Sequence, residues 1–152
     1  MDIKIKLDDG YMPCRKTDGA AAYDLFAPND ITIYKGRQVV DMRFSLEMPK
    51  NIAAFIQARS GFSVNGFVGQ VFKGGELKRF DADVITGLVD SDYRGHVGVI
   101  VQSRESSSFF VPKGTRIAQM LFVEIPQIKI FEVNSLSNSE RGAGGFGSTG
   151  VK

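Results

Sequence analysis

The chain has 152 residues, of which 43% are hydrophobic and 24% charged, and its formal net charge is +2. These values are ordinary for a globular protein of about one domain, and they exclude wholesale disorder. They also argue against nucleic-acid binding, because no block of like charges forms a basic arm.

The rare residues and the apolar runs narrow the class of protein further. Cys14 is the single cysteine, which excludes an internal disulfide, and His96 is the single histidine, which excludes a zinc site of Cys and His ligands. No apolar run approaches the roughly 18 residues of a membrane span, and the acidic N-terminus is unlike a signal peptide. We therefore expect a soluble intracellular protein of the cytoplasm or nucleus, with no membrane partner.

Alternation of apolar and polar residues predicts short β-strands along most of the chain. In chain order these segments are residues 2–7, 31–33, 44–48, 96–101, 116–125 and 128–133. Turn-forming groups of Gly, Pro, Asn and Asp separate them. The apolar run 116–125 ends before Pro126 and is interpreted as a buried strand, and segment 67–80 predicts a hairpin around its central glycines. Short strands with no long helical period predict an antiparallel all-β sandwich or barrel.

Several segments within this pattern carry residues suited to phosphate chemistry. Segment 141–150 combines Arg141 and Phe146 with two hydroxyls and five glycines. Glycine-rich backbone can crowd N–H groups around phosphate oxygens, a guanidinium matches phosphate geometry, and an aromatic ring can stack on a base. Segment 58–61 offers a second Arg, Ser and Gly combination. A passive tail for 141–150 and a surface turn for 58–61 are the alternative interpretations.

Carboxylate and amide side chains occur in three further segments. A polar turn between two apolar runs predicts a β-hairpin over 87–97, with Asp90 at the end of its first strand and Tyr93 close by. Asp90 is either a functional carboxylate or a turn former. Gln119 lies inside the run 116–122, where a buried amide needs a partner such as a phosphate or a metal-bound water. Asp24 follows a run of small residues.

In this order the five segments resemble the five motifs of the trimeric dUTP diphosphatase (dUTPase) family. The matching stretches are AAAYDLFA at 20–27, ARSG at 58–61, GLVDSDYRG at 87–95, RIAQMLF at 116–122 and RGAGGFGSTG at 141–150. The resemblance spans almost the whole chain. It implies a jelly-roll-like β-clip fold, a homotrimer with shared active sites, and Mg²⁺-dependent cleavage of dUTP to dUMP and pyrophosphate.

The resemblance also implies a catalytic role for Asp90, whose carboxylate would orient and deprotonate the water that attacks the α-phosphorus. Asp24 and Gln119 would hold Mg²⁺ through its water ligands, which suits an ion that dehydrates reluctantly. Uracil would be read by the backbone at Gly87 and Gly98, and Tyr93 would lie against the deoxyribose. The expected phosphate-binding residues of a neighbouring subunit are Arg59, Ser60 and Gly61.

By the same resemblance, residues 1–138 form the β-barrel domain and residues 139–152 form a flexible arm that closes over an active site. Phe146 of the arm would cap the uracil ring. The residues expected to take the γ-phosphate are Arg141, Gly147, Ser148 and Thr149.

Three other functions are considered as alternatives to this interpretation. A dCTP deaminase of the same fold would need a Glu beside the base, and segment 87–97 contains none. A non-catalytic dUTP-binding regulatory protein would keep the scaffold without turnover, and RNA binding would depend only on the mild basicity.

Segment 67–80 makes the stretch between the second and third motifs longer than the family usually has. It is interpreted either as a tolerated surface insertion or as a partner-binding or trimer-interface element. His96 is expected to face solvent.

Overall fold

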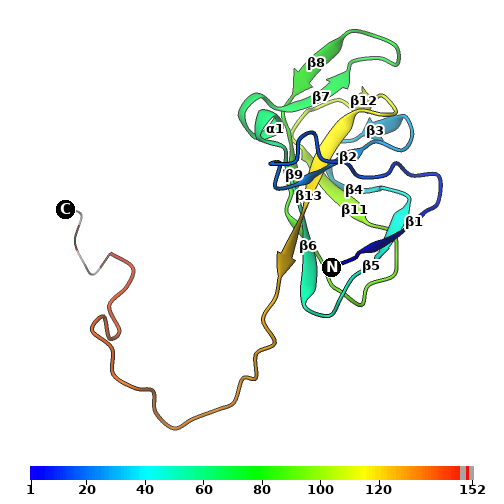
Figure 1. Cartoon of the computed structure of the whole chain (residues 1–152). Coiled ribbons are helices and arrows are strands. Elements are labelled where there is room, and N and C mark those ends of the chain that lie inside the picture. The colour runs from blue at the N-terminus through cyan, green and yellow to red at the C-terminus, as the bar shows by residue number, and fades with distance from the viewer. Residues whose placement is uncertain (148–149, 151–152) are drawn as a thin grey trace.

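The computed structural model describes residues 1–147 and 150, and strands make up most of its regular structure (Figure 1). The strands are β1 (Lys4–Leu7), β2 (Tyr23–Phe26), β3 (Ile31–Ile33), β4 (Gly36–Asp41), β5 (Phe44–Glu47), β6 (Ile52–Gln57), β7 (Phe67–Gln70), β8 (Leu77–Phe80), β9 (Ala82–Ile85), β10 (Gly87–Val89), β11 (Gly98–Ser103), β12 (Phe109–Val111) and β13 (Arg116–Glu124). A short helix, α1 (Ser60–Asn65), follows β6. Within the described residues, no helix is both long enough and apolar enough to cross a membrane.

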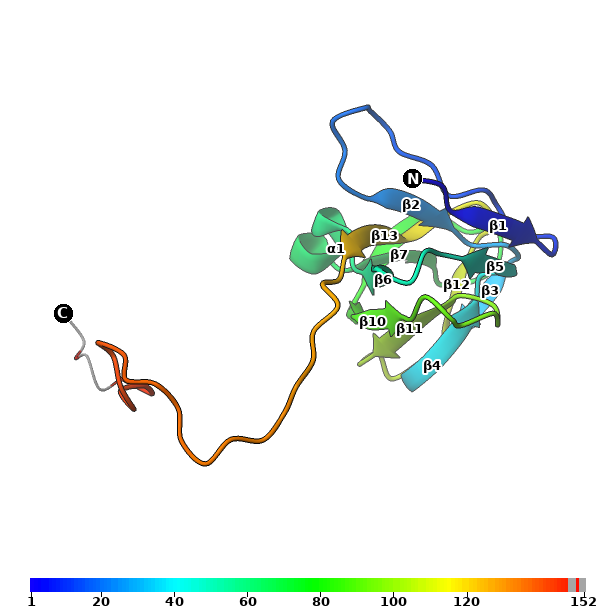
Figure 2. The same ribbon diagram turned by 60° about the horizontal axis from the view of Figure 1, so that its bottom comes forward.

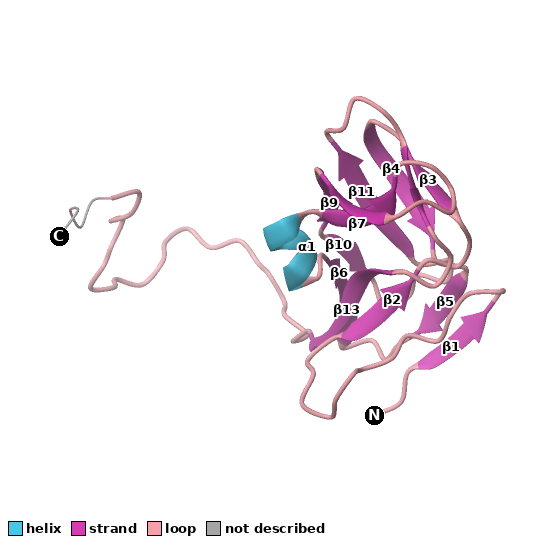
Figure 3. Cartoon of the chain, turned by 90° about the horizontal axis from the view of Figure 1, so that it is seen from above, coloured by secondary structure: helices cyan, strands magenta, loops and turns pink. Residues whose placement is uncertain are grey.

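All strand pairs in the described chain are antiparallel, and they form small sheets around a shared interior (Figure 3). The strand orders are β1-β5, β10-β6-β13-β2, β4-β11-β9 and β3-β12-β7-β8. Alternation sets the inward faces, as in β11, where Val99 and Val101 are fully buried and Ile100 between them is partly exposed. Phe44, Phe67 and Phe109 are among the largest fully buried side chains. The predicted all-β fold is confirmed.

Most of the predicted strands are also confirmed. The apolar run 116–125 is β13, which lies between β2 and β6 in the interior of its sheet. Segment 67–80 is a hairpin in which Phe67 of β7 is paired with Phe80 of β8. Helix α1 was not predicted, because its six residues are too short to show a helical period.

The strand predicted over residues 128–133 is wrong. The last backbone link to the sheet is the hydrogen bond from Ile125 N–H to the Asn51 carbonyl, and the chain then runs away from the strands (Figures 1 and 2). Ile128, Ile130 and Phe131 are exposed, and no strand in the described part of this chain pairs with them. A segment of alternating apolar and polar residues forms a strand only where a neighbouring strand can hydrogen-bond to its backbone.

The β-hairpin predicted over residues 87–97 is also wrong. The polar turn is present, but β10 pairs with β6 whereas β11 pairs with β4 and β9, so the turn connects two different sheets. Val97 fixes the crossing, because its N–H donates to the Phe44 carbonyl and its carbonyl accepts from Met42 N–H. Because the chain passes from one sheet to the other here, no strand-to-strand hydrogen bonds join β10 to the start of β11.

The hairpin of β7 and β8 is packed firmly against the core at its base. Phe80 stacks on Phe109 with ring centroids 4.2 Å apart, and Phe67 packs against the same ring at 6.0 Å. At Gly69, an added Cβ would lie 2.6 Å from Cδ2 of Phe109 and 2.7 Å from the Phe110 carbonyl oxygen. Only glycine therefore fits at this position of β7.

Replacing Gly69 with alanine should lower the free energy of unfolding by about 1–3 kcal/mol, because the new methyl group overpacks the core. Gly19→Ala is the matched control, since an added Cβ there meets nothing within 4 Å. Chemical denaturation of the three proteins measures the difference. Equal stability of the Gly69 and Gly19 variants would contradict the packing described for β7.

Candidate active site

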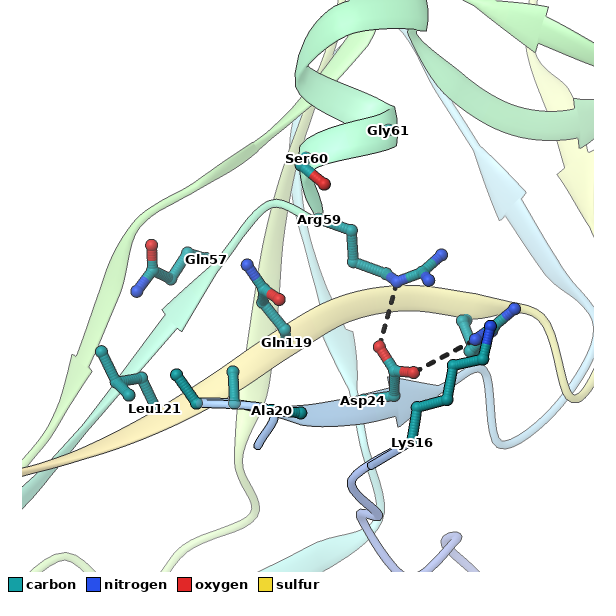
Figure 4. A pocket seen from close by; sticks show the side chains of 12 residues that line it. Lys16, Ala20, Asp24, Gln57, Arg59, Ser60, Gly61, Gln119 and Leu121 are labelled. Atoms are coloured by element: carbon teal, nitrogen blue, oxygen red, sulfur yellow. Dashed lines mark hydrogen bonds and ion pairs between the residues drawn. The ribbon is translucent and has the colours of Figure 1, made fainter. Parts of the chain in front are cut away.

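Three neighbouring strands place polar side chains on one face of their sheet. Gln119 of β13 is directly opposite Asp24 of β2 on one side and Gln57 of β6 on the other. Residues in direct register across antiparallel strands project to the same face. The three side chains accordingly line one pocket of about 550 Å³, shown in Figure 4 and called the phosphate pocket below.

An irregularity in β13 adds Arg116 to this pocket. In a regular strand, residues as far apart as Arg116 and Gln119 would point to opposite faces. The register with β2 shifts between Arg116 and Ala118, which is the signature of a β-bulge. Because of this shift both Arg116 and Gln119 line the phosphate pocket.

The Asp24 carboxylate lies between two guanidinium groups (Figure 4). Arg59 Nε donates to one carboxylate oxygen at 3.0 Å, and Arg116 Nη1 donates to the other at 3.3 Å. Only 15% of the Asp24 side chain is exposed, so these pairs are better shielded than ordinary surface ion pairs. Sequence reasoning missed Arg116, although it is the first residue of the fourth motif.

The pocket has an excess of positive charge. Lys16, Arg59 and Arg116 line it together with the single carboxylate of Asp24, and Ser60 and Gly61 complete the wall where β6 leads into α1. The first amides of a helix have no acceptor within the helix. Such a combination of cations, a hydroxyl and free amides favours an anion.

Asp24 and Gln119 are two of the side-chain oxygen donors that a Mg²⁺ ion would meet here, beside Gln57 and Ser60. Gln119 Nε2 donates to the Ala58 carbonyl at 2.9 Å, which leaves the amide oxygen available as an acceptor. Among the described residues, no group of three or more His, Cys, Asp or Glu side chains could hold a metal. The donor set therefore fits an ion that takes most of its ligands from water and substrate.

A second pocket, of about 240 Å³, lies where β10 and β11 diverge and is called the base pocket below. Gly87, Asp90, Tyr93 and Gly98 line it. β10 is the outer strand of its sheet, and β9 pairs with β11 only from Ile100 onward. In the described chain, no strand fills the space between, so peptide groups at both edges can meet a flat ligand.

The loop between β10 and β11 positions Tyr93. The Tyr93 hydroxyl donates to the His96 carbonyl at 3.0 Å, and a Cβ at Gly95 would overlap the Tyr93 phenol. Asp90 directly follows β10, and within the described residues its carboxylate has no ion-pair partner. The Asp90 carboxylate lines the base pocket without a cation of the described chain beside it.

His96 fastens this loop to the N-terminal part of the chain. Its Nδ1 lies 3.0 Å from the Asp41 carboxylate and its Nε2 lies 3.0 Å from that of Asp8. Hydrogen bonds to Asp41 and then to Asp8 raise the pKa of His96 above its ordinary value of 6.5. The His96 side chain is 36% exposed, and its ring also bridges two carboxylates, which the sequence did not predict.

The structure divides the predicted site residues into separate groups. Arg59, Ser60 and Gly61 join Asp24 and Gln119 in the phosphate pocket, and no residue lines both that pocket and the base pocket. The tail that carries Arg141, Phe146 and Gly147 extends away from the sheets (Figure 1), and Phe146 is fully exposed. Ser148 and Thr149 lie outside the described residues. Within the described residues, a single copy of the chain does not bring the predicted residues to one place.

Comparison with known proteins identifies the family. A family model described as dUTPase matches residues 8–150. The deoxyuridine 5'-triphosphate nucleotidohydrolase of cowpox virus is 39% identical over 141 residues, covering 92% of this chain and 86% of the viral protein. The vaccinia virus protein of the same name is 38% identical with the same coverage.

Solved structures from phages share the fold. The dUTPase of Staphylococcus bacteriophage 80alpha with dUpNHpp matches with a TM-score of 0.81 at 24% identity, covering 99% of both chains. A mutant dUTPase of the S. aureus phage phi11, described with a structural Mg(II) ion, matches with a TM-score of 0.73 at 16% identity, covering 89% of this chain and 98% of the phage chain.

The antiparallel sheets and their phage counterparts define the chain as an all-β protein of the β-clip fold. Within that class, the family model and the poxviral relatives decide the family. The chain belongs to the dUTPase family, as its five motifs predicted, and it is an enzyme of that family.

The clasp formed by His96, Asp8 and Asp41 predicts a pH-dependent part of the stability. Because folding raises the pKa of His96, its contribution is complete below pH 6.5, the ordinary value, and is lost as the pH rises through the higher folded value. Between pH 6 and pH 9, the Tm of the wild type should fall more than that of His96→Gln.

Thermal unfolding of both proteins across that range tests the clasp. The other partners of the two carboxylates are unchanged in the variant: Lys6 pairs with Asp8, and the Arg43 N–H donates to Asp41. Parallel Tm curves for the two proteins would show that the ring does not hold its proton between the carboxylates.

Proposed function

We propose that this chain is a homotrimeric, Mg²⁺-dependent dUTP diphosphatase that hydrolyses dUTP to dUMP and pyrophosphate. Such a reaction limits uracil incorporation into DNA and supplies dUMP for thymidylate synthesis. The observation that carries the proposal is the separation of a cationic phosphate pocket from a base pocket within one chain. The names of the cowpox and vaccinia relatives support the same substrate.

A trimer with shared sites accounts for this separation. The phosphate pocket of one copy completes the base pocket of a neighbouring copy, and the arm of residues 139–152 closes over the combined site. Exposed apolar side chains in the segment before the arm, among them Ile128, Ile130 and Phe131, support contact with another copy. Closure by the arm excludes water and completes the set of contacts.

Asp90 acts as the general base in this proposal. Its unpaired carboxylate takes a proton from a water molecule, and the water oxygen bonds to the α-phosphorus. The bond from the α-phosphorus to the bridging oxygen breaks in line with the attack, so pyrophosphate leaves and dUMP remains. Little covalent help is needed, because phosphoryl transfer depends mainly on positioning and charge neutralisation.

The phosphate pocket supplies that positioning. Arg59, Ser60 and the Gly61 backbone hold the phosphate chain, and Arg116 keeps the Asp24 carboxylate in place beside it. When bound, Mg²⁺ neutralises charge on the phosphate oxygens. Asp24 and Gln119 accept hydrogen bonds from the water ligands of the ion and so orient them.

Specificity arises in the base pocket. Peptide groups at Gly87 and Gly98 match the uracil edge, and cytosine would leave them unpaired, which is costly in a closed site. Gly98 lies directly under Val39, whose Cγ1 would be 2.7 Å from an added Cβ, so the backbone rather than a side chain meets the base. Tyr93, held by His96, leaves no room for a ribose 2′-hydroxyl.

Hydrolysis of dUTP, dTTP, dCTP and UTP with Mg²⁺, followed by chromatography, tests the proposal directly. We expect dUMP and pyrophosphate from dUTP and little turnover of the others. Tight dUTP binding without turnover would instead support the non-catalytic regulatory alternative.

Asp90→Asn should lower kcat by about 10²–10⁴-fold, the usual contribution of a general base, while dUTP binding persists because the shape is unchanged. Asp92→Asn is the control, since that carboxylate is exposed in the same loop and does not line the base pocket. A near-normal kcat for the Asp90 variant would overturn its assigned role.

Deleting residues 139–152 should leave a folded trimer with much weaker catalysis. The described residues of this segment form no strand and contribute no side chain to the buried core, so their removal exposes no core (Figure 1). Sedimentation and Tm report the assembly, and kcat/KM for dUTP reports closure. Loss of the trimer on truncation would show that the segment belongs to the domain rather than to an arm.

A further inference from the structure

The hairpin of β7 and β8 forms one wall of a groove that continues from the phosphate pocket. This groove has a volume of about 430 Å³, and Val68, Leu77 and Arg79 of the hairpin line it. Arg59, Gly61 and Arg116 line both the groove and the phosphate pocket. Segment 67–80 therefore borders the functional site, which a tolerated surface insertion would not need to do.

Arg79 and Arg59 line the same groove and contact one aromatic ring. The guanidinium carbons of Arg59 and Arg79 each lie 5.9 Å from the centroid of the Phe62 ring. Arg79 Nη1 also donates to the Gly66 carbonyl at 3.1 Å. Phe62 is itself buried, with its ring centroid 4.7 Å from that of Phe67, so the ring that both arginines contact is fixed in the core.

The charges of the two arginines are balanced differently. Arg59 shares the Asp24 carboxylate with Arg116, whereas Arg79 has no carboxylate within 4.0 Å among the described residues. The groove therefore adds an unneutralised guanidinium at the end of a pocket that already favours anions. A guanidinium presents a planar set of donors that matches phosphate oxygens.

We propose that Arg79 is a substrate-binding residue that takes the terminal phosphate of the nucleoside triphosphate and the outer phosphate of the pyrophosphate product. The inference rests on the proposed function and assigns segment 67–80 to the substrate site. The nucleoside monophosphate does not reach Arg79, because only the longer triphosphate chain extends from the phosphate pocket into the groove.

Arg79→Gln and Lys78→Gln form a matched pair for the test. Each removes one positive charge from an exposed position of β8. Successive residues of a strand point to opposite faces, and only Arg79 lines the groove. Dissociation constants for dUpNHpp, pyrophosphate and dUMP, measured by calorimetry with Mg²⁺, need no turnover.

Arg79→Gln should weaken binding of dUpNHpp and pyrophosphate by about tenfold, the effect expected from losing a charge-assisted hydrogen bond. It should leave dUMP binding and Tm unchanged, and Arg79→Lys should recover part of the loss. Lys78→Gln should match the wild type for all three ligands.

Equal losses in the two Gln variants would overturn the proposal, since they would indicate only a general field effect. An equal loss of dUMP affinity in Arg79→Gln, or no loss for pyrophosphate, would overturn it as well. If the wild type failed to hydrolyse dUTP, the proposed function would fail, but the pyrophosphate comparison would still decide the role of Arg79.

Discussion

The ladder of β13 with β2 and β6 is the constraint on which the phosphate pocket depends. It fixes Gln119 opposite Asp24 and Gln57, and its bulge turns Arg116 to the same face. Asp24 then receives one guanidinium from its partner strand β13 and another from the turn after β6. A single sheet thus positions groups that the chain supplies from three separate segments. The backbone, more than the choice of side-chain rotamers, determines which groups meet in the pocket.

A different constraint separates the base pocket from this sheet. Because β10 and β11 belong to different sheets, their edges stay open to a flat ligand instead of closing on each other. The same crossing carries Asp90 and Tyr93 away from the phosphate pocket. In the proposed trimer, assembly is part of the chemistry, since a neighbouring copy brings the cations of its phosphate pocket to the base pocket.

The sequence predicts most strands well, because burial of one face imposes local alternation of apolar and polar residues. The prediction fails where a strand also needs a neighbouring strand to pair with. Residues 128–133 alternate like a strand but have no ladder partner within the described chain. The pairs that define the sites are distant in sequence: Arg116 and Asp24 are 92 residues apart, and His96 and Asp8 are 88 apart. Motif resemblance supplied the family and the candidate residues, but neither the pairing of Arg116 with Asp24 nor the clasp at His96 could be read from a local pattern.

A hairpin can place a side chain at a binding site only if its base is rigid. Here the stacking of Phe80 on Phe109, and the tight fit of Gly69 against the same ring, fix the strands of the hairpin to the core. Rigidity at the base holds the guanidinium of Arg79 in one place over Phe62, so its charge acts at a defined point beside the phosphate pocket. Residues 71–76 at the tip do not line the groove, and Lys73 there pairs instead with Asp30. Variation at the tip is therefore expected to leave nucleotide binding intact, whereas variation in β8 is not.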